Sequence, residues 1–442
     1  MNNETAWNKI FEDYQILDKI HKNGSFRISA DDIKKYREPR LMTKFDFHSQ
    51  LPTIFKKENL SILPITRGDY IISDIKTFET LPNNNDTPLV DKIIPNNIES
   101  LDFSSITSEA IAINCAYVSD ILSDFAEDGD LFPTVNSRMK SDNFSFNIER
   151  SQKGKQSLNV DVNNAQIEID GGFEGETSLI LLEAKNKVCA DFMVRQLYYP
   201  YRKWQNKIRK TVRPVFFEYS NGIFHLREYK FEDLYNYNSL QLLRQRKYRL
   251  RDAEIHINTQ TLQDLLHTTE LISEPEFVPF PQADSFERII NLCEVLYDSE
   301  DEFFTKEMLN YNMNFTGRDS FTSRQVDYYT NAAIYLGLIR KNGTGRREDP
   351  DWFELTDKGK MALNTKSINE RQIKYIQAII SHQAFARVLR LYLEEAETPS
   401  IDEIIEIMKD SQLRNMNTEK MFRRRASTVK SWIEWIIRTM DE

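Results

Sequence analysis

The sequence predicts a multidomain α+β protein, with a mixed sheet in the middle of the chain and helical units after it. Two stretches divide the 442 residues into three parts: 81–97 is rich in proline and asparagine, and 273–284 is rich in proline. Proline fixes φ and removes a backbone donor, so such stretches favour linkers over regular elements. The middle part mixes helical and strand-like patterns, whereas the last part is mostly helical in its periodicity. This separation favours an α+β architecture.

We expect residues 1–97 to form an N-terminal α/β domain. Apolar residues recur at helical spacing over 7–20. Two short apolar runs, 60–66 and 69–75, then flank a turn and predict two strands. No residue of this domain has a recognisable catalytic pattern.

Residues 98–275 are predicted to form the domain that contains the mixed sheet. An apolar stripe at helical spacing predicts a helix over 107–125. Strand-like runs follow around 144–148, in a hairpin over 166–186 and over 214–229, and a further helix begins near Asp191. This order of elements predicts a sheet flanked by helices.

The remaining residues are predicted to form two C-terminal helical units. Helical patterns over 285–298, 304–312 and 322–339 precede a glycine-containing hairpin over 340–360. Three helices and a hairpin in this order are the arrangement of a winged helix, a form of helix-turn-helix, which we expect over 276–365. Three more helical patterns predict a second helical or winged-helix-like unit over 366–442.

The hairpin carries three charged residues at the ends of its apolar runs: Asp170, Glu183 and Lys185. Side chains alternate along a strand, so Glu183 and Lys185 point the same way, and pairing of the two strands brings Asp170 toward them. Two carboxylates at one sheet edge can bind Mg²⁺ together with phosphate oxygens and water. Such an ion activates a bound water and neutralises charge on a scissile phosphate, and a lysine can orient the water. Asp170 and Glu183 are therefore the predicted metal ligands, and Lys185 the predicted catalytic lysine.

This pattern resembles the PD-(D/E)XK nuclease superfamily, in which an aspartate at a strand start or bend precedes Glu-x-Lys on the next strand. Here Asp170 lies thirteen positions before Glu183, Lys185 follows two positions later, and Ile169 stands where the superfamily pattern has proline. The resemblance covers about 107–235. It implies a PD-(D/E)XK endonuclease core, Mg²⁺ as cofactor, and a supporting role for Gln196 on the following helix.

Two further carboxylates are candidates for the same site. Glu109, at the start of the helix 107–125, could be an additional ligand or a charge favoured at a helix N-terminus. Glu168 shares a strand face with Asp170 and could replace or assist it. The sequence leaves both alternatives open.

Clusters of basic residues predict DNA contacts, although the formal net charge of −10 argues against indiscriminate nucleic-acid binding. Between 201 and 260, thirteen Lys or Arg stand against six Asp or Glu, and a second basic cluster lies near the C-terminus. Polarised charge of this kind fits a protein that meets a polyanion along one face. The expected contacts are Arg202 and Lys203 beside the cleavage site, Arg324, Gln325, Tyr328 and Asn331 for base readout, Arg346 and Arg347 at the hairpin tip, and Arg423, Arg424, Arg425 and Lys430 on phosphates.

Together these patterns imply a sequence-specific type II restriction endonuclease acting on double-stranded DNA, to which the N-terminal domain would contribute target recognition. A homodimer, including one that forms only on DNA, and a separate methyltransferase are the expected partners. A methylation-dependent endonuclease, or a winged-helix regulator with a vestigial nuclease fold, remains an alternative. No signal-peptide pattern or membrane-length apolar run occurs, and the three cysteines are scattered, so we expect a prokaryotic cytoplasmic protein without a membrane partner.

Overall fold

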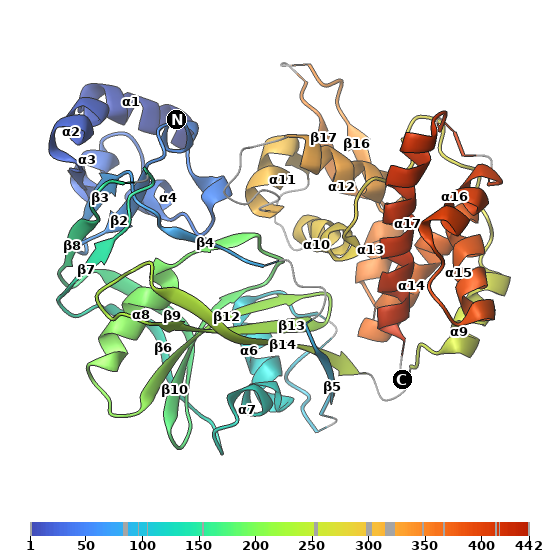
Figure 1. Cartoon of the computed structure of the whole chain (residues 1–442), viewed down its shortest axis with the longest axis horizontal. Helices are drawn as coiled ribbons and strands as arrows, with labels where there is room; N and C mark the ends of the chain where they lie inside the picture. The colour runs from blue at the N-terminus through green and yellow to red at the C-terminus, as the bar shows by residue number, and fades with distance from the viewer. Residues whose placement is uncertain are drawn as a thin grey trace.

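The computed structural model describes residues 2–82, 87–95, 97–103, 105–152, 154–251, 255–297, 303–313, 323–346, 349–365, 367–411, 413–414 and 416–440. The structure is mixed α+β, as predicted. Figure 1 shows an N-terminal unit (blue), a central sheet (green) and a helical C-terminal part (orange and red) that lies beside both. Among the described residues, no helix has both the length and the apolar composition needed to cross a membrane.

The N-terminal unit combines short helices with a three-stranded antiparallel sheet of order β1-β3-β2. The helical pattern over 7–20 is divided at Gln15, whose left-handed backbone (φ 49°) separates two helices. The rings of Trp7, Phe11 and Phe55 meet edge to face in the core. Its elements are α1 (Asn3–Asp13), α2 (Ile16–Asn23), β1 (Phe26–Ser29), α3 (Ala30–Lys34), α4 (Pro39–Thr43), η1 (His48–Gln50), α5 (Thr53–Lys57), β2 (Ser61–Pro64) and β3 (Asp69–Ser73).

The central sheet has seven strands in the order β5-β14-β13-β12-β10-β9-β6. It is mixed, because β10–β12 and β14–β5 pair in parallel and the other neighbours are antiparallel. The strands are β5 (Leu89–Ile93), β6 (Phe132–Lys140), β9 (Gln166–Glu174), β10 (Ser178–Lys185), β12 (Thr211–Ser220), β13 (Ile223–Phe231) and β14 (Leu240–Arg251). The stretch 81–97 is therefore more than a linker, since it contains a strand of this sheet.

Helices cover both faces of the sheet. On one face, α6 (Glu109–Val118) and α7 (Ile121–Ala126) pack on Ile180, Leu182 and Ala184 of β10. On the other face, residues of α8 (Arg195–Gln205) pack on Leu179 and Leu181. Because side chains alternate along a strand, these apolar residues determine on which face of the sheet each polar side chain of β10 lies. The helix predicted over 107–125 is interrupted at 120, where the backbone is left-handed.

Two small antiparallel sheets of two strands each lie between the N-terminal unit and the central sheet. They are β4 (Phe78–Thr80) with β11 (Asp191–Met193), and β7 (Phe144–Ile148) with β8 (Leu158–Val162). A hydrophobic core runs from Trp7 and Phe55 through Phe146 to Tyr198 on α8 and Phe216 on β12. The N-terminal unit therefore shares its core with the sheet, across the predicted boundary at 97.

The C-terminal part begins with the order helix, strand, helix, helix, strand, strand. These elements are α10 (Phe286–Tyr297), β15 (Phe304–Thr305), α11 (Lys306–Met313), α12 (Ser323–Tyr335), β16 (Ile339–Asn342) and β17 (Trp352–Leu355), with sheet order β15-β17-β16. Helices α13 (Asp357–Leu363), α14 (Ile368–Ile380), α15 (Gln383–Glu395), α16 (Ile401–Lys409) and α17 (Glu419–Thr439) follow, and α9 (Thr259–Thr268) packs against α15. The described part of 366–442 contains helices and no strand, so it has no wing.

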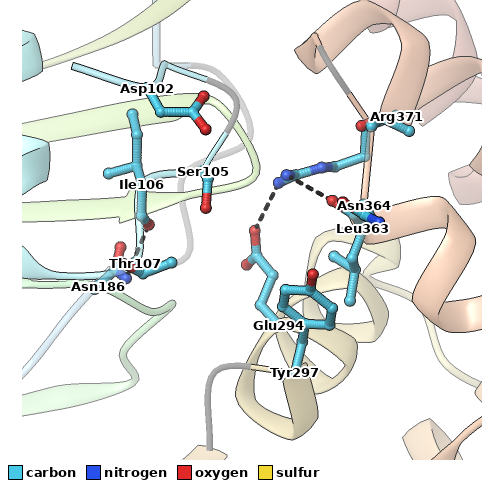
Figure 2. Close-up of a pocket in the computed structure, with 11 residues that line it drawn as sticks. Asp102, Ser105, Ile106, Thr107, Asn186, Glu294, Tyr297, Leu363, Asn364 and Arg371 are labelled. Atoms are coloured by element: carbon cyan, nitrogen blue, oxygen red, sulfur yellow. Dashed lines mark hydrogen bonds and ion pairs between the residues drawn. The ribbon is translucent and has the colours of Figure 1, made fainter. Parts of the chain in front are cut away.

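Polar contacts hold the C-terminal part against the central sheet. Glu294 on α10 accepts hydrogen bonds from Ser220 Oγ (2.8 Å) and the Asn221 N–H (3.0 Å) at the end of β12. Arg371 on α14 pairs with the same carboxylate at 3.7 Å. Figure 2 shows this pair beside a cavity of about 440 Å³ between the two parts, with Asn186 on the opposite wall. These partly buried hydrogen bonds thus help to fix the orientation of the helical part on the sheet.

Candidate active site

Asp170 lies where β9 leaves its backbone pairing with β10. The paired positions of these strands end at Gly171 and Leu182. On its other side β9 pairs with β6, where Ile169 lies opposite Ser137 and Gly172 lies opposite Val135. Two residues of β9, 170 and 171, therefore stand opposite a single residue of β6, which is a β-bulge. The Asp170 carboxylate accepts the Ala184 N–H (2.8 Å) beyond the last backbone pair. The aspartate therefore stands at a strand bend and remains tied to the strand that carries the other charged residues.

Glu183 and Lys185 project from β10 toward the α8 face. They alternate with Leu182 and Ala184, which pack on α6 and α7. Both charged residues are buried, with 5% and 7% of their surfaces exposed. Lys185 Nζ donates to Glu183 Oε1 at 2.6 Å. The pairing predicted from strand alternation is thus present.

Gln196 connects α8 to these charges. Its side-chain Nε2 donates to Glu183 Oε1 in a close contact and to Asp46 Oδ1 at 3.1 Å. The other end of the amide, Oε1, is buried without a hydrogen-bond partner among the described residues. Gln196 therefore orients the Glu183 carboxylate and keeps one acceptor available.

Asp46, in the N-terminal unit, contacts two of the predicted catalytic residues, although the sequence patterns did not indicate it. Besides accepting from Gln196, its Oδ2 lies 3.7 Å from Lys185 Nζ. It stands between Phe45 and Phe47, both buried. An acidic residue between two core aromatics is a weak signal of a polar site. Sequence spacing could not have joined it to a hairpin so far along the chain.

All four predicted catalytic residues line one pocket of about 210 Å³. Asp170, Glu183, Lys185 and Gln196 share it with Asp46, Glu109, Glu168, Lys44 and Arg195. Both carboxylates left open by the sequence therefore reach the pocket. Glu168 is also paired with Arg138 at 3.1 Å on the exposed side of β9. The wall is strongly polar, as binding of an ion or a phosphate requires.

Burial governs the charges in this pocket. It is the main cause that raises the pKa of Glu183 to about 8; the ammonium group of Lys185 opposes the rise, and the negative charges of Asp170 and Asp46 add to it. Burial also raises the pKa of Asp170. Burial alone would lower the pKa of Lys185 and raise that of Asp46, but the attraction between opposite charges reverses both shifts. The pocket thus holds more carboxylates than its buried ammonium group can neutralise.

This imbalance fits a divalent cation. Mg²⁺ uses one or two carboxylates and completes its coordination with water and phosphate oxygens. Asp170 and Glu183 supply two carboxylates, and the Oε1 of Gln196 is a buried acceptor with an unfilled hydrogen bond. Within the described ranges, no three His, Cys, Asp or Glu side chains form a complete metal cage. A metal here would depend on water and substrate for its remaining ligands.

Comparisons with known families match three segments of the chain, each to a domain of unknown function. Residues 4–72 match DUF6996, residues 73–249 match DUF6997, and residues 288–441 match DUF7226. No curated protein and no solved structure matches the chain. None of these descriptions gives an activity. The predicted catalytic residues all lie in the second segment, whereas Asp46 lies in the first.

Arg202 and Lys203 do not lie on an exposed surface as predicted. Arg202 is 3% exposed, donates to Ser145 O at 3.0 Å and lies over the Phe144 ring at 4.8 Å. Lys203 is 7% exposed and pairs with Asp142 at 3.1 Å. Both side chains follow α8 into the core, so they stabilise the fold and are not available to a DNA phosphate.

Internal ion pairs also neutralise much of the basic surplus over 201–260. Arg213 and Arg244 pair with Glu228, Arg246 pairs with Asp124, and Arg249 and Arg251 pair with Asp91. These arginines join β12, β14 and their neighbours, and a count of charges along the sequence could not reveal their partners.

The other predicted DNA contacts lie on the C-terminal part. On α12, Val326, Tyr329, Ala333 and Leu336 are buried as predicted, while Gln325 is exposed and Tyr328 and Asn331 are half-buried. Arg346 is exposed beyond β16, and on α17 Arg423 and Arg424 are exposed while Arg425 and Lys430 are half-buried. Arg347 and the side chain of Arg324 lie outside the described residues.

Proposed function

We propose that the protein is a Mg²⁺-dependent endonuclease of the PD-(D/E)XK type that hydrolyses double-stranded DNA at specific sequences, as type II restriction enzymes do. The observation that supports it most is the convergence of Asp170, Glu183, Lys185 and Gln196 in one polar pocket at the end of a strand ladder. The parallel β10–β12 pair, the bulge at Asp170 and helices on both sheet faces are further support.

Each residue has a role that follows from its contacts. Mg²⁺ bound by Asp170 and Glu183 would activate a water and neutralise charge on the scissile phosphate. Lys185 holds its ammonium group beside Glu183, where it can orient that water or contact the phosphate. Gln196 fixes the Glu183 carboxylate, and its unfilled Oε1 can accept a hydrogen bond from the water and so orient it. The products would be 5′-phosphate and 3′-hydroxyl ends, as in the enzymes that the sequence resembles.

The C-terminal part supports DNA binding. The element order from α10 to β17 and the sheet order β15-β17-β16 support a winged-helix interpretation, with α12 as the recognition helix. Gln325 and Asn331 on its outer side can make paired hydrogen bonds to adenine. Arg425 is near enough to Tyr328 for the two side chains to interact electrostatically, which brings the basic start of α17 close to α12.

Double-strand cleavage requires two reactions, and each chain has one such pocket among its described residues. A homodimer, formed in solution or on DNA, would supply two sites. A separate methyltransferase that protects host DNA belongs to the same proposal, as does a prokaryotic cytoplasmic location.

Alanine substitution of Asp170, Glu183 or Lys185 tests the proposal. Each variant should cut phage DNA about 100-fold more slowly, or not at all, because it loses a metal ligand or the catalytic ammonium group. DNA binding without Mg²⁺ should be retained. Asp69→Asn is a matched control, since Asp69 is also an aspartate in an ion pair, with Arg27 at 2.9 Å, but it does not line the pocket. Its activity should stay close to that of the wild type.

Wild-type activity in all three alanine variants would refute the proposed site. Using unmodified and methylated DNA side by side separates the remaining functions. Cutting of unmodified DNA supports restriction, and cutting of methylated DNA alone supports a methylation-dependent enzyme. Binding without cutting of either substrate would make the protein a DNA-binding regulator with a vestigial nuclease fold.

A further inference from the structure

The N-terminal unit places one carboxylate inside the candidate active site. Asp46 lines the same pocket as Asp170 and Glu183, although it precedes them by more than a hundred residues. Its carboxylate receives a hydrogen bond from Gln196 (3.1 Å) and lies 3.7 Å from the Lys185 ammonium group. Two of the four predicted catalytic residues are therefore in contact with a side chain from another part of the chain.

The backbone around Asp46 is fixed on both sides. Its N–H donates to Gln50 Oε1 (2.8 Å), which is a local contact within the N-terminal unit. Its carbonyl accepts the Met193 N–H (2.9 Å) from β11, two residues before α8 begins. The carboxylate is thus held in a defined position between the N-terminal unit and the sheet.

Neighbouring contacts strengthen the same junction. The His48 N–H donates to Asp191 Oδ1 at 3.0 Å. The Lys187 ammonium group lies over the Phe47 ring, 4.5 Å from its centre. Residues 46–48 therefore contact the segment that connects β10 to α8. This segment sets the distance between Lys185, at the end of β10, and Gln196, at the start of α8.

We propose that Asp46 is a positioning residue of the endonuclease site, so that the N-terminal unit completes the site by holding Lys185 and Gln196 in place. This inference rests on the proposed function. The Lys185 ammonium group lies 2.6 Å from the Glu183 carboxylate and 3.7 Å from that of Asp46. The attraction of Asp46 therefore limits how closely the ammonium group is drawn to Glu183. Gln196 is likewise held between two carboxylates, which fixes the plane of its amide. A residue that orients catalytic side chains in this way acts through them and does not touch the substrate.

Asp46→Asn is the test variant, because it keeps the shape of the side chain and removes its charge. Asp69→Asn is a matched control: Asp69 is also an aspartate of the N-terminal unit in an ion pair, with Arg27 at 2.9 Å, but it does not line the pocket. Cleavage by the full-length Asp46→Asn variant should be slower by roughly 10- to 100-fold. The Asp69→Asn variant should cut at the wild-type rate, and thermal unfolding of each variant reports whether it is folded.

The dependence on Mg²⁺ separates positioning from a purely structural role. Asp46 holds Gln196, and Gln196 fixes the Glu183 carboxylate, so Asp46→Asn should raise the Mg²⁺ concentration needed for half-maximal cleavage several-fold. A fold that is merely weakened would lower the rate without changing that concentration. A wild-type rate and Mg²⁺ dependence, or faster cutting because Lys185 is released, would overturn the proposal.

A second measurement does not depend on cleavage. Only the uncharged amine of a lysine reacts with acetic anhydride, so the reactivity of Lys185, measured by peptide mass spectrometry, reports how strongly its charge is held. Asp46→Asn should increase this reactivity several-fold at alkaline pH, and Asp69→Asn should not. Unchanged reactivity would refute the proposed contact. If the wild-type protein cuts no DNA but reactivity rises in Asp46→Asn, the proposed endonuclease fails while the hold of Asp46 on Lys185 stands.

Discussion

At the scale of single residues, we expect the charge of Glu183 to decide whether the pocket binds a cation. Burial raises the pKa of this carboxyl to about 8, so below that pH it carries a proton and is a poor metal ligand. The cleavage rate should therefore rise as the pH rises through about 8. Higher Mg²⁺ should move the rise to lower pH, because the cation competes with the proton.

Initial cleavage rates between about pH 6 and about pH 9, at two Mg²⁺ concentrations, test this expectation. The profile of Asp69→Asn should match that of the wild type, since Asp69 pairs with Arg27 and does not line the pocket. A rate that is independent of both pH and Mg²⁺ over this range would show that Glu183 is not a metal ligand.

The residues of one hairpin could be predicted from sequence, whereas their partners could not. Alternation along a strand is a local rule, and it places Glu183 and Lys185 on one face once Leu179 and Leu181 define that face. Asp46 comes from a separately matched segment, and only the tertiary fold brings it to Lys185. For the same reason, the sequence could not distinguish the buried Arg202 from an exposed one.

At the scale of elements, the basic start of α17 should bind DNA without regard to base sequence. Arg424 is exposed there, next to Arg425, which lies near Tyr328 of α12. Arg424→Ala should weaken binding equally for all sequences and reduce the slope of log K against log salt by about 1, because one phosphate contact is lost. Fluorescence anisotropy on two unrelated duplexes, at several salt concentrations, measures both quantities.

Lys34→Ala is the comparison for Arg424→Ala. Lys34 is an exposed cation at the end of α3, at the far side of the molecule from α17 (Figure 1). Its removal should leave the salt slope unchanged. If Arg424→Ala also leaves the slope unchanged, α17 does not contact the DNA backbone.

Helical elements were predicted well, and their assembly less so. The apolar spacing of α12 correctly predicts that Val326 and Tyr329 are buried, because a helix packed on one side repeats at a fixed period. The same period occurs in a winged helix and in a helical bundle. The pattern over 366–442 therefore could not show that this region lacks strands in its described part. Strand β5 was hidden in a proline-rich stretch because its pairing with β14 is non-local.

At the scale of the whole molecule, one hydrophobic core unites the two C-terminal units that the sequence divides at 365. Residues from α10 and α12 belong to the same cluster as residues from α14, α15 and α17. Trp432 on α17 packs on Phe286 of α10 and Phe385 of α15, with ring centres 5.2 Å and 5.0 Å apart. Its indole N–H also donates to Ala283 O at 2.8 Å, before α10. The predicted recognition helix α12 thus belongs to a core that the far end of the chain completes.

Trp432→Ala should therefore destabilise the proposed winged helix as well as α17. Removing a buried tryptophan costs about 3–5 kcal/mol, and the carbonyl of Ala283 also loses its partner. Hydrogen exchange measured by mass spectrometry should show faster exchange in α10, α15 and α17 together, with the central sheet much less affected. Leu271→Ala is the control, since Leu271 is 58% exposed and its truncation should change stability by less than about 0.5 kcal/mol. Faster exchange confined to α17 would mean that the two units fold independently, and that the sequence-based boundary at 365 describes the molecule better than its shared core does.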